Sequence, residues 1–190
     1  MRIIAGTARG RHFDAPKGMD TRPTLDRVKE ALFGSIQFDI PDSSVLDLFS
    51  GSGNLGLEAA SRGAARVVCN DRNRDCAEQI RQNAKLLQLD SVVQVLCRDY
   101  TACLSDLARA GERFDFIFLD APYKDGTAQA AAEQIFTLGL LTEQGRVIIE
   151  HADKQPPKLE TPLAELMHTR RYGSCAISYF KQASHEAHLE

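Results

Sequence analysis

Several kinds of segment are missing from this chain, and each absence excludes a class of protein. No run of about 18 apolar residues occurs, so we expect no membrane-spanning helix. The basic N-terminus is not followed by the apolar stretch of a signal peptide, which predicts a cytoplasmic protein. Internal repeats and low-complexity tracts are also absent. With 43% hydrophobic and 26% charged residues, the 190-residue chain has the composition and size of one folded domain.

Cysteine and histidine are few, and neither residue type forms a recognisable ligand set. The five cysteines include no C-x-x-C pair, which is unlike a disulfide framework or a zinc site. The five histidines are scattered along the chain. We therefore predict reduced, partly buried cysteines and no bound metal.

A large charge of one sign is missing overall but present locally. The formal net charge is −3, which by itself argues mildly against a nucleic-acid partner. Residues 1–29, however, hold seven basic and three acidic side chains, a net charge of +4 that leaves −7 for the remainder. A basic N-terminal segment on an acidic body fits an enzyme that binds nucleic acid through one face.

Apolar periodicity divides the chain into two patterns. Residues 2–13 alternate weakly around Gly6 and Gly10, which favours a short kinked hairpin. Thr24 can cap a following helix that ends near Ile40. From residue 44 onward, strands expected at 45–49, 65–70, 92–97, 114–119, 146–150 and 172–181 alternate with helices expected at 55–61, 74–89, 101–110 and 126–136. This order implies a mostly parallel sheet with helices on both faces and ligands at the carboxyl ends of its strands.

A glycine-rich turn stands between the first of these strands and its helix. Gly51, Gly53 and Gly56 match G-x-G-x-x-G, which lets the backbone turn sharply and lets a ligand approach the main chain. Asp71 closes the second strand 20 residues after Gly51, where a carboxylate can accept both hydroxyls of a ribose. The pattern predicts a ribose-bearing ligand.

Two ligand classes use such a corner, a nicotinamide dinucleotide and S-adenosylmethionine. Asp47, four residues before Gly51, is poorly placed for a pyrophosphate but suits a ligand with a positive amino group and a sulfonium. Asp47 could instead bond the backbone of the turn. Asp99, after the third strand, can accept from the adenine amine, cap the next helix, or do both.

The tetrad Asp120-Ala121-Pro122-Tyr123 directly follows the most apolar strand. Methyl transfer to a nucleobase amine needs acceptors that hold the amine hydrogens and turn its lone pair toward the methyl group. Asp120 and the Ala121 carbonyl can supply them, Tyr123 can stack on an extruded base, and Pro122 would stiffen the turn. Guanine presents only donors at N1 and N2, which suits a carboxylate better than the amide that adenine would favour.

These motifs resemble a known family. The string 47–53 with the tetrad looks like a methyltransferase of the Rossmann-like class that uses S-adenosylmethionine. Residues 2–6, 9–11, 21–24 and 26–33 sharpen this likeness to the RsmD family of bacterial small-subunit rRNA guanine-N2 methyltransferases. The resemblance implies a seven-stranded sheet whose last strand, near 174–180, is antiparallel, and an N-terminal hairpin that helps to hold RNA. It also implies S-adenosylhomocysteine as product and 16S rRNA of the small ribosomal subunit or its assembly intermediate as substrate.

Residue roles follow from the same resemblance. The implied catalytic residues are the tetrad Asp120, Ala121, Pro122 and Tyr123. Cofactor contacts are implied for Asp47, Phe49, Ser50, Gly51, Gly53, Asp71, Arg72, Asp99, Tyr100, Asp120, Arg22, Pro23 and Thr24. RNA contacts are implied for Arg2, Arg9, Arg11, Lys17 and Arg22.

Two residues depart from the family pattern. Ala121 replaces a proline but keeps its main-chain carbonyl, and Asp71 replaces a longer Glu. We expect an extension at 1–40 that grips RNA and covers the cofactor, a catalytic domain at 41–183, a polar tail at 184–190, and a monomer. The alternatives are a methyltransferase of another RNA or DNA base amine, a nicotinamide-dependent oxidoreductase, and a non-catalytic ribosome-assembly factor.

Overall fold

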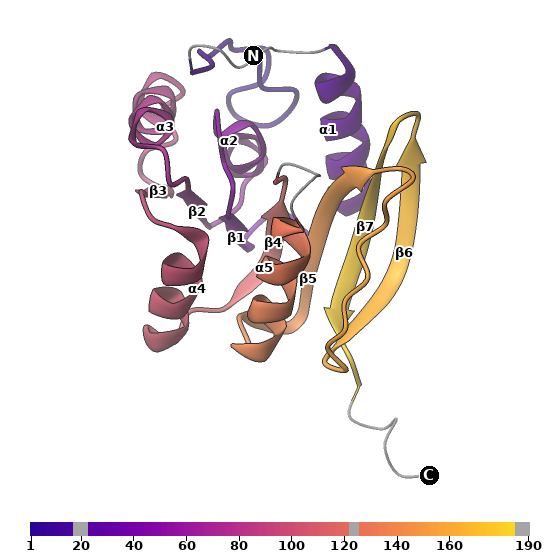
Figure 1. Cartoon of the computed structure of the whole chain (residues 1–190). Helices are drawn as coiled ribbons and strands as arrows, with labels where there is room; N and C mark the ends of the chain where they lie inside the picture. The colour runs from indigo at the N-terminus through magenta and orange to yellow at the C-terminus, as the bar shows by residue number, and fades with distance from the viewer. Residues whose placement is uncertain (17–22, 122–125, 185–190) are drawn as a thin grey trace. The chain divides into compact units, whose positions relative to one another are not determined.

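The computed structural model describes residues 1–16, 23–121 and 126–184 (Figure 1). The chain divides into two compact units, Met1–Cys103 and Leu104–Glu190. Each unit carries part of a sheet and the helices that connect its strands. Within the described ranges, no helix is both long and apolar enough to cross a lipid bilayer.

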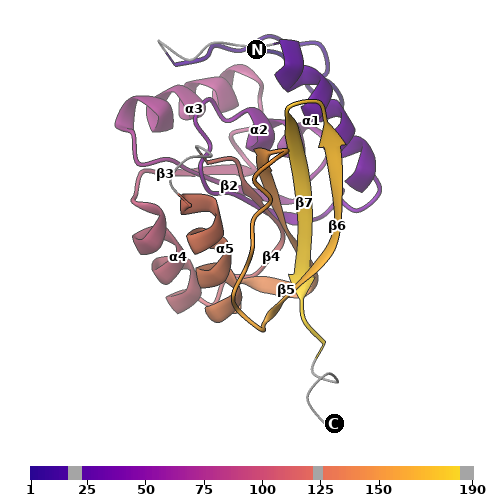
Figure 2. The ribbon, with the colours of Figure 1, turned by 45° about the vertical axis from the view of Figure 1, so that its right-hand side comes forward.

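The first unit contains three short parallel strands, β1 (Ser44–Asp47), β2 (Arg66–Asn70) and β3 (Val93–Leu96), in the order β3-β2-β1. Its helices are α1 (Pro23–Ile36), α2 (Asn54–Ser61), α3 (Arg74–Leu86) and the start of α4 (Tyr100–Arg109). In Figures 1 and 2, α2 lies between α1 and α3. The β1 and β2 side chains are almost fully buried, as expected for strands covered on both faces. Because the strands are parallel, their carboxyl ends meet at one edge.

The second unit contains β4 (Phe114–Leu119), α5 (Thr127–Thr137), β5 (Leu141–Ala152), β6 (Ala164–Tyr172) and β7 (Cys175–Gln182). β4 and β5 are parallel, whereas β7 is antiparallel to both β5 and β6. β7 lies between β5 and β6 (Figure 2). Over the described residues the structure has seven strands, and the last one is antiparallel to its neighbours, so the expected strand number and the antiparallel last strand are confirmed.

Some expected elements need correction. β6 was not predicted from the residue pattern, because almost all of its side chains are exposed and the apolar alternation that marks a strand is missing. β5 begins at Leu141 instead of residue 146. Thr24 lies inside α1, which begins at Pro23, so it is not the residue that precedes the helix. α1 ends at Ile36 and α3 at Leu86, both earlier than expected.

Residues 1–13 fold back on themselves around one antiparallel bridge between Arg2 and His12. The Ile3 N–H donates to the Arg11 carbonyl and the Phe13 N–H to the Met1 carbonyl, each over 3.0 Å, which is the pairing of a short hairpin. The Thr7 N–H donates to the Ser61 carbonyl at the end of α2 over 2.8 Å. Gly6 has φ +86° there, and a Cβ on it would stand 1.7 Å from the Ser61 oxygen. Only glycine permits this close approach of the segment to α2.

Candidate functional site

The turn Gly51–Gly56, which we call the cofactor turn, connects β1 to α2. Gly51 and Gly53 have φ angles of +54° and +81°, in the left-handed region that glycine adopts without strain. Gly56 lies in the first turn of α2, and a Cβ there would come within 2.4 Å of the Cys69 Sγ on β2. Glycine at this position therefore lets α2 pack directly against the sheet.

Asp47 ends β1 beneath the cofactor turn and is 1% exposed. Its Oδ2 accepts from the Gly56 N–H over 2.9 Å, as the backbone-bonding interpretation predicts. Its Oδ1 is buried and accepts no hydrogen bond from any residue that the structure describes. Burial raises the pKa of Asp47 to about 7, although the bond from the Gly56 N–H opposes that shift. One buried carboxylate oxygen is thus left without a donor among the residues that the structure describes.

Asp71 lies just after β2 and ties that strand end to the turn. Its Oδ2 accepts from the Gly51 N–H and its Oδ1 from the Asn73 N–H, each over 2.8 Å. A carboxylate oxygen can accept more than one hydrogen bond, so these contacts leave capacity for ribose hydroxyls. Ser50 is also engaged here, since its hydroxyl donates to the Asp47 carbonyl over 2.7 Å.

Beyond β3, Asp99 accepts from the backbone N–H and the hydroxyl of Thr101, over 2.9 and 2.6 Å. These bonds lower the pKa of its carboxyl, which is exposed. Asp99 thus caps α4, as one of its two interpretations predicts, and adenine recognition stays a prediction. The Phe49 and Tyr100 rings lie 5.5 Å apart between centroids, tilted by 54°. Arg72 is exposed at the same edge.

Asn70, at the end of β2, is a site residue that sequence reasoning missed. It is 1% exposed, and its Nδ2 donates to the carbonyls of Leu48 over 3.2 Å and Arg98 over 3.1 Å. One amide therefore joins the segments that follow β1 and β3. Its place at a strand end directly before Asp71 was the available signal.

A second missed group is a buried ion pair between Lys29 on α1 and Glu58 on α2, 3.2 Å apart. Lys29 Nζ also donates to the Asn54 side chain in the cofactor turn over 2.7 Å and to the Arg2 carbonyl over 2.8 Å. Burial lowers the pKa of Lys29, and the Glu58 carboxylate opposes that shift. Glu58 accepts further bonds from the N–H groups of residues 4 and 5. The pair therefore joins the N-terminal segment, α1 and the cofactor turn.

The N-terminal cations differ in what they contact. Arg2, Arg9 and Arg11 are exposed, but Arg2 lies 3.2 Å from Asp26 and the Arg11 guanidinium donates to the Leu86 carbonyl. Lys29 contributes to the count of +4 but is buried, so the exposed positive charge is smaller than that count indicates.

The predicted residues Lys17, Arg22, Pro122 and Tyr123 lie outside the described residues, and Pro23 and Thr24 form the start of α1.

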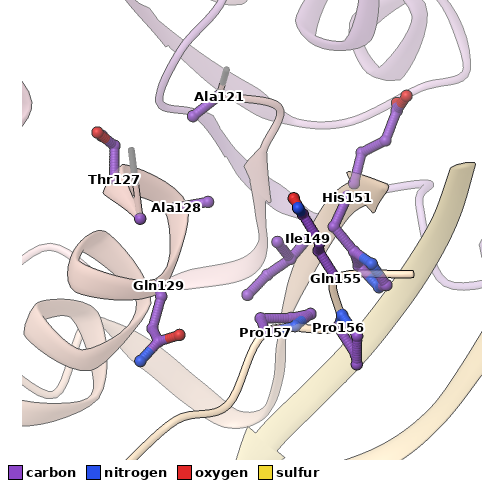
Figure 3. A pocket seen from close by; sticks show the side chains of 11 residues that line it. Ala121, Thr127, Ala128, Gln129, Ile149, His151, Gln155, Pro156 and Pro157 are labelled. Atoms are coloured by element: carbon purple, nitrogen blue, oxygen red, sulfur yellow. The ribbon is translucent and has the colours of Figure 1, made fainter. Parts of the chain in front are cut away.

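In the second unit, Asp120 and Ala121 follow β4, with Asp120 half-buried and Ala121 buried. Beside them is a cavity of about 200 Å³, which we call the α5–β5 pocket. It is lined by Ala121, the start of α5, the end of β5 and residues 155–157 (Figure 3). The cavity lies at the carboxyl ends of the parallel strands β4 and β5, where open α/β sheets bind ligands.

The wall at residues 155–160 is held on α5 by side chains. Gln129 Oε1 accepts from the Lys158 N–H over 3.3 Å, and Glu133 Oε1 accepts from the Glu160 N–H over 3.0 Å. On the β5 side, His151 is 6% exposed and is bonded through both ring nitrogens, over 2.9 Å with the Ala152 carbonyl and 2.8 Å with the Ser178 hydroxyl. Side-chain hydrogen bonds therefore hold two of the walls of this pocket.

The first unit's parallel strands, glycine turn and strand-end carboxylates define the Rossmann-like nucleotide-binding class of α/β protein. Within that class, the chain belongs to the family described as conserved hypothetical protein 95, whose model matches residues 1–181.

Individual relatives place this family among rRNA methyltransferases. YlbH of Bacillus subtilis strain 168, named as a proposed rRNA methyltransferase, is 36% identical over 184 residues, or 96% of this chain and 99% of that protein. The ribosomal RNA small subunit methyltransferase D of Escherichia coli strain K12 is 33% identical over 150 residues, or 79% and 74% of the two chains. The solved structure of Escherichia coli yhhF, a proposed methyltransferase, has a TM-score of 0.82 at 30% identity, covering 96% and 97%. The expected family and Rossmann-like fold are confirmed.

Proposed function

We propose that this protein transfers a methyl group from S-adenosylmethionine to the exocyclic N2 of a guanine in 16S rRNA, in the small ribosomal subunit or its assembly intermediate. Sequence similarity to rRNA methyltransferases supports the reaction class and the RNA substrate. One structural observation carries the choice of cofactor, the buried Oδ1 of Asp47 at the cofactor turn, which accepts no hydrogen bond from the described residues. The positive amino group of the cofactor would supply the missing donor.

The residues around the turn fit the other parts of this cofactor. The Gly51 and Gly56 N–H groups are already bonded to Asp71 and Asp47, so the carboxylate of the methionine moiety would face the N-terminal end of α2 instead. Asp71 can accept the ribose hydroxyls, Asp99 the adenine amine, and the Phe49 and Tyr100 rings offer apolar faces near the adenine. S-adenosylmethionine supplies an electrophilic methyl group on a positively charged sulfur. Residues 22–24 and Arg72 complete the proposed cofactor contacts.

At the other substrate, Asp120 and the Ala121 carbonyl accept the hydrogens of the guanine amine and direct its lone pair toward the methyl carbon. That lone pair forms the new N–C bond, while the sulfur keeps the electron pair of the bond that breaks. Asp120 accepts the proton that N2 then loses. Tyr123 stacks on the extruded base, and Pro122 stiffens the segment. Cysteine chemistry is not needed, because no covalent enzyme intermediate forms.

For RNA binding we propose contacts from Arg2, Arg9, Arg11, Lys17 and Arg22 to phosphates. Residues 1–40 then form the extension that grips RNA and covers the cofactor, and residues 41–183 form the catalytic domain. The enzyme would act as a monomer in the cytoplasm, where small subunits assemble.

The test is methylation of small subunits from a strain that lacks this gene, followed by mass spectrometry for N2-methylguanosine and its position. Asp120→Ala should lower the rate at least about 100-fold, because the amine loses its main acceptor. Calorimetry should show that this variant still binds S-adenosylmethionine with an affinity lowered only slightly, because the contacts from the first unit remain. The matched control is Asp90→Ala at an exposed position, which should keep full activity. Methylation at another atom, or a near-normal rate in Asp120→Ala, would contradict the proposal.

A further inference from the structure

The α5–β5 pocket is small and lies next to Ala121. Its volume of about 200 Å³ is below the roughly 300–1,000 Å³ of sites that enclose a whole small-molecule ligand. A whole S-adenosylmethionine molecule is therefore too large for it. Ala121 lies on one side of the pocket, directly after Asp120. If the proposed function is right, the extruded guanine must bring its N2 to this point.

The lining offers flat apolar surfaces for such a ring. Ile149, Pro156 and Pro157 border the cavity, and Figure 3 shows them on the side opposite Ala121 and Thr127. Apolar side chains that enclose an extruded base replace part of the stacking that the base loses when it leaves the RNA. They cannot distinguish one base from another, because every base has a flat face. Recognition of guanine requires polar groups at the edge of the ring.

Most polar side chains that line this pocket already have interaction partners. Both ring nitrogens of His151 have partners, and Gln129 holds the backbone of Lys158. Gln155 is different, since its side-chain amide has no hydrogen bond to any residue in the described ranges. Its backbone N–H donates to the Ala152 carbonyl over 2.9 Å, which fixes the residue in a turn after β5. Figure 3 shows Gln155 in the middle of the pocket, between the Ala121 side and His151.

We propose that Gln155 is a specificity-determining residue that reads the guanine edge next to the methylated amine. On that edge, N2 is followed by the N1–H donor and the O6 acceptor. The Gln155 amide carries one acceptor and two donors, so its Oε1 can accept from N1–H while its Nε2 donates to O6. Asp120 and Ala121 then hold the amine, and Gln155 holds the rest of the edge. This assignment rests on the proposed transfer to guanine N2.

A thermodynamic cycle that combines a change of Gln155 with a change of the target base tests whether the Gln155 amide contacts the guanine edge. The substrate is 16S rRNA, assembled into small subunits, with either guanine or 2-aminopurine at the methylated position. 2-Aminopurine keeps the 2-amino group but lacks both O6 and the N1–H. We expect wild-type kcat/KM to fall roughly five- to tenfold with 2-aminopurine, as for the loss of one or two hydrogen bonds. Gln155→Ala should show the same fall with guanine and almost no further fall with 2-aminopurine.

Two further variants separate recognition from damage to the pocket. Gln155→Glu offers only acceptors and should be slower than Gln155→Ala with guanine, because its carboxylate repels O6. Gln129→Ala loosens the wall and should lower kcat/KM equally with both substrates. All three variants should bind S-adenosylmethionine with wild-type affinity, as measured by calorimetry.

The outcomes distinguish the two proposals. Wild-type enzyme that methylates guanine N2, combined with unchanged kcat/KM in Gln155→Ala or with equal losses on both substrates, would overturn the role of Gln155 alone. Failure of the wild-type enzyme to methylate guanine N2 would overturn the proposed function, and the role of Gln155 with it. A kcat/KM loss in Gln155→Ala that is seen with guanine and disappears with 2-aminopurine would support both the proposed function and the role of Gln155.

Discussion

In both units the polar side chains at the strand ends are bonded mainly to the backbone of neighbouring segments, but the pocket of the second unit also holds Gln155, whose amide has no such bond among the described residues. Asp47, Asn70 and Asp71 each contact the main chain near the cofactor turn. In the α5–β5 pocket, Gln129 and His151 are committed in a similar way, but Gln155 is exposed at the centre. The two regions thus differ in how much of their polar surface the fold itself uses.

This difference has a consequence for what each region can tolerate. Groups that bind the backbone of a buried turn support the fold and the ligand site together, so a change in one alters the other. A side chain that only faces a cavity can be replaced without loss of structure. We therefore expect substitutions in the first unit to alter stability or cofactor affinity, and substitutions at Gln155 to alter substrate choice.

The largest effect should follow removal of the Lys29 cation. Lys29→Met leaves Glu58 as a buried carboxylate without its lysine partner and frees the Asn54 and Arg2 contacts. Loss of one partner of a buried ion pair costs about 3–5 kcal/mol of unfolding free energy. Because Arg62 Nε stays 2.7 Å from the Glu58 carboxylate, we expect a loss near the lower end of that range. Urea denaturation followed by circular dichroism should show this loss.

The second unit supplies the matched control for this substitution. Lys181 lies 3.3 Å from Glu165, but both side chains are more than 40% exposed. Lys181→Met should therefore cost less than about 1 kcal/mol. Equal losses in the two variants would show that burial of the Lys29 pair does not set the difference between the regions.

Much of the fold was predictable, because apolar residues recur at the spacing of a strand or of a helix in most of the chain. The strand at Phe114–Leu119 and the turn from β1 into α2 are close to expectation, since apolar runs and glycines mark them directly. β6 was not predicted from its pattern, because an almost wholly exposed strand has no buried face to impose alternation. Its position depends on pairing with β7, which is a contact between distant residues and not a local property.

The site shows the same division between local and distant information. The motif residues from Asp47 to Gly56 and Asp71 could be found from spacing alone, and the structure brings them together. Lys29 was counted as a surface cation, because nothing in its local sequence reveals that Glu58, 29 residues later, meets it in the interior. Gln155 lay in a segment defined only by two following prolines, so its place in a pocket could come only from the fold.

A smaller effect is expected at Asp47, as a dependence of cofactor affinity on pH. Burial raises the pKa of Asp47 to about 7, so the folded protein holds a proton that the unfolded chain releases near pH 4. Stability should therefore fall as pH rises from about 4 to about 7. A cofactor with a positive amino group favours the ionised carboxylate, so its affinity should rise at least about tenfold between pH 5.5 and pH 7.5.

Asp47→Asn provides the comparison for this pH dependence. It keeps a side-chain oxygen that can accept from the Gly56 N–H but has no charge to titrate. Calorimetry with S-adenosylmethionine should show weaker binding with a nearly flat pH profile. A variant that kept the wild-type slope would show that another group causes the pH dependence and that Asp47 does not face the amino group.

The smallest effect concerns the exposed part of the first unit, where side chains are not committed to the interior. Each arginine that contacts an RNA phosphate adds about 0.7–0.9 to the slope of log affinity against log salt concentration. Arg9→Ala with Arg11→Ala should therefore reduce the slope by about 1.5, with Arg9 giving the larger share because Arg11 also donates to the Leu86 carbonyl. Filter binding of 16S rRNA at several salt concentrations measures this, with Arg113→Ala as an exposed control from the second unit. If the slope stayed unchanged in the double variant, RNA would not contact these two arginines, and the proposed RNA contacts of the segment would be reduced to Arg2, Lys17 and Arg22.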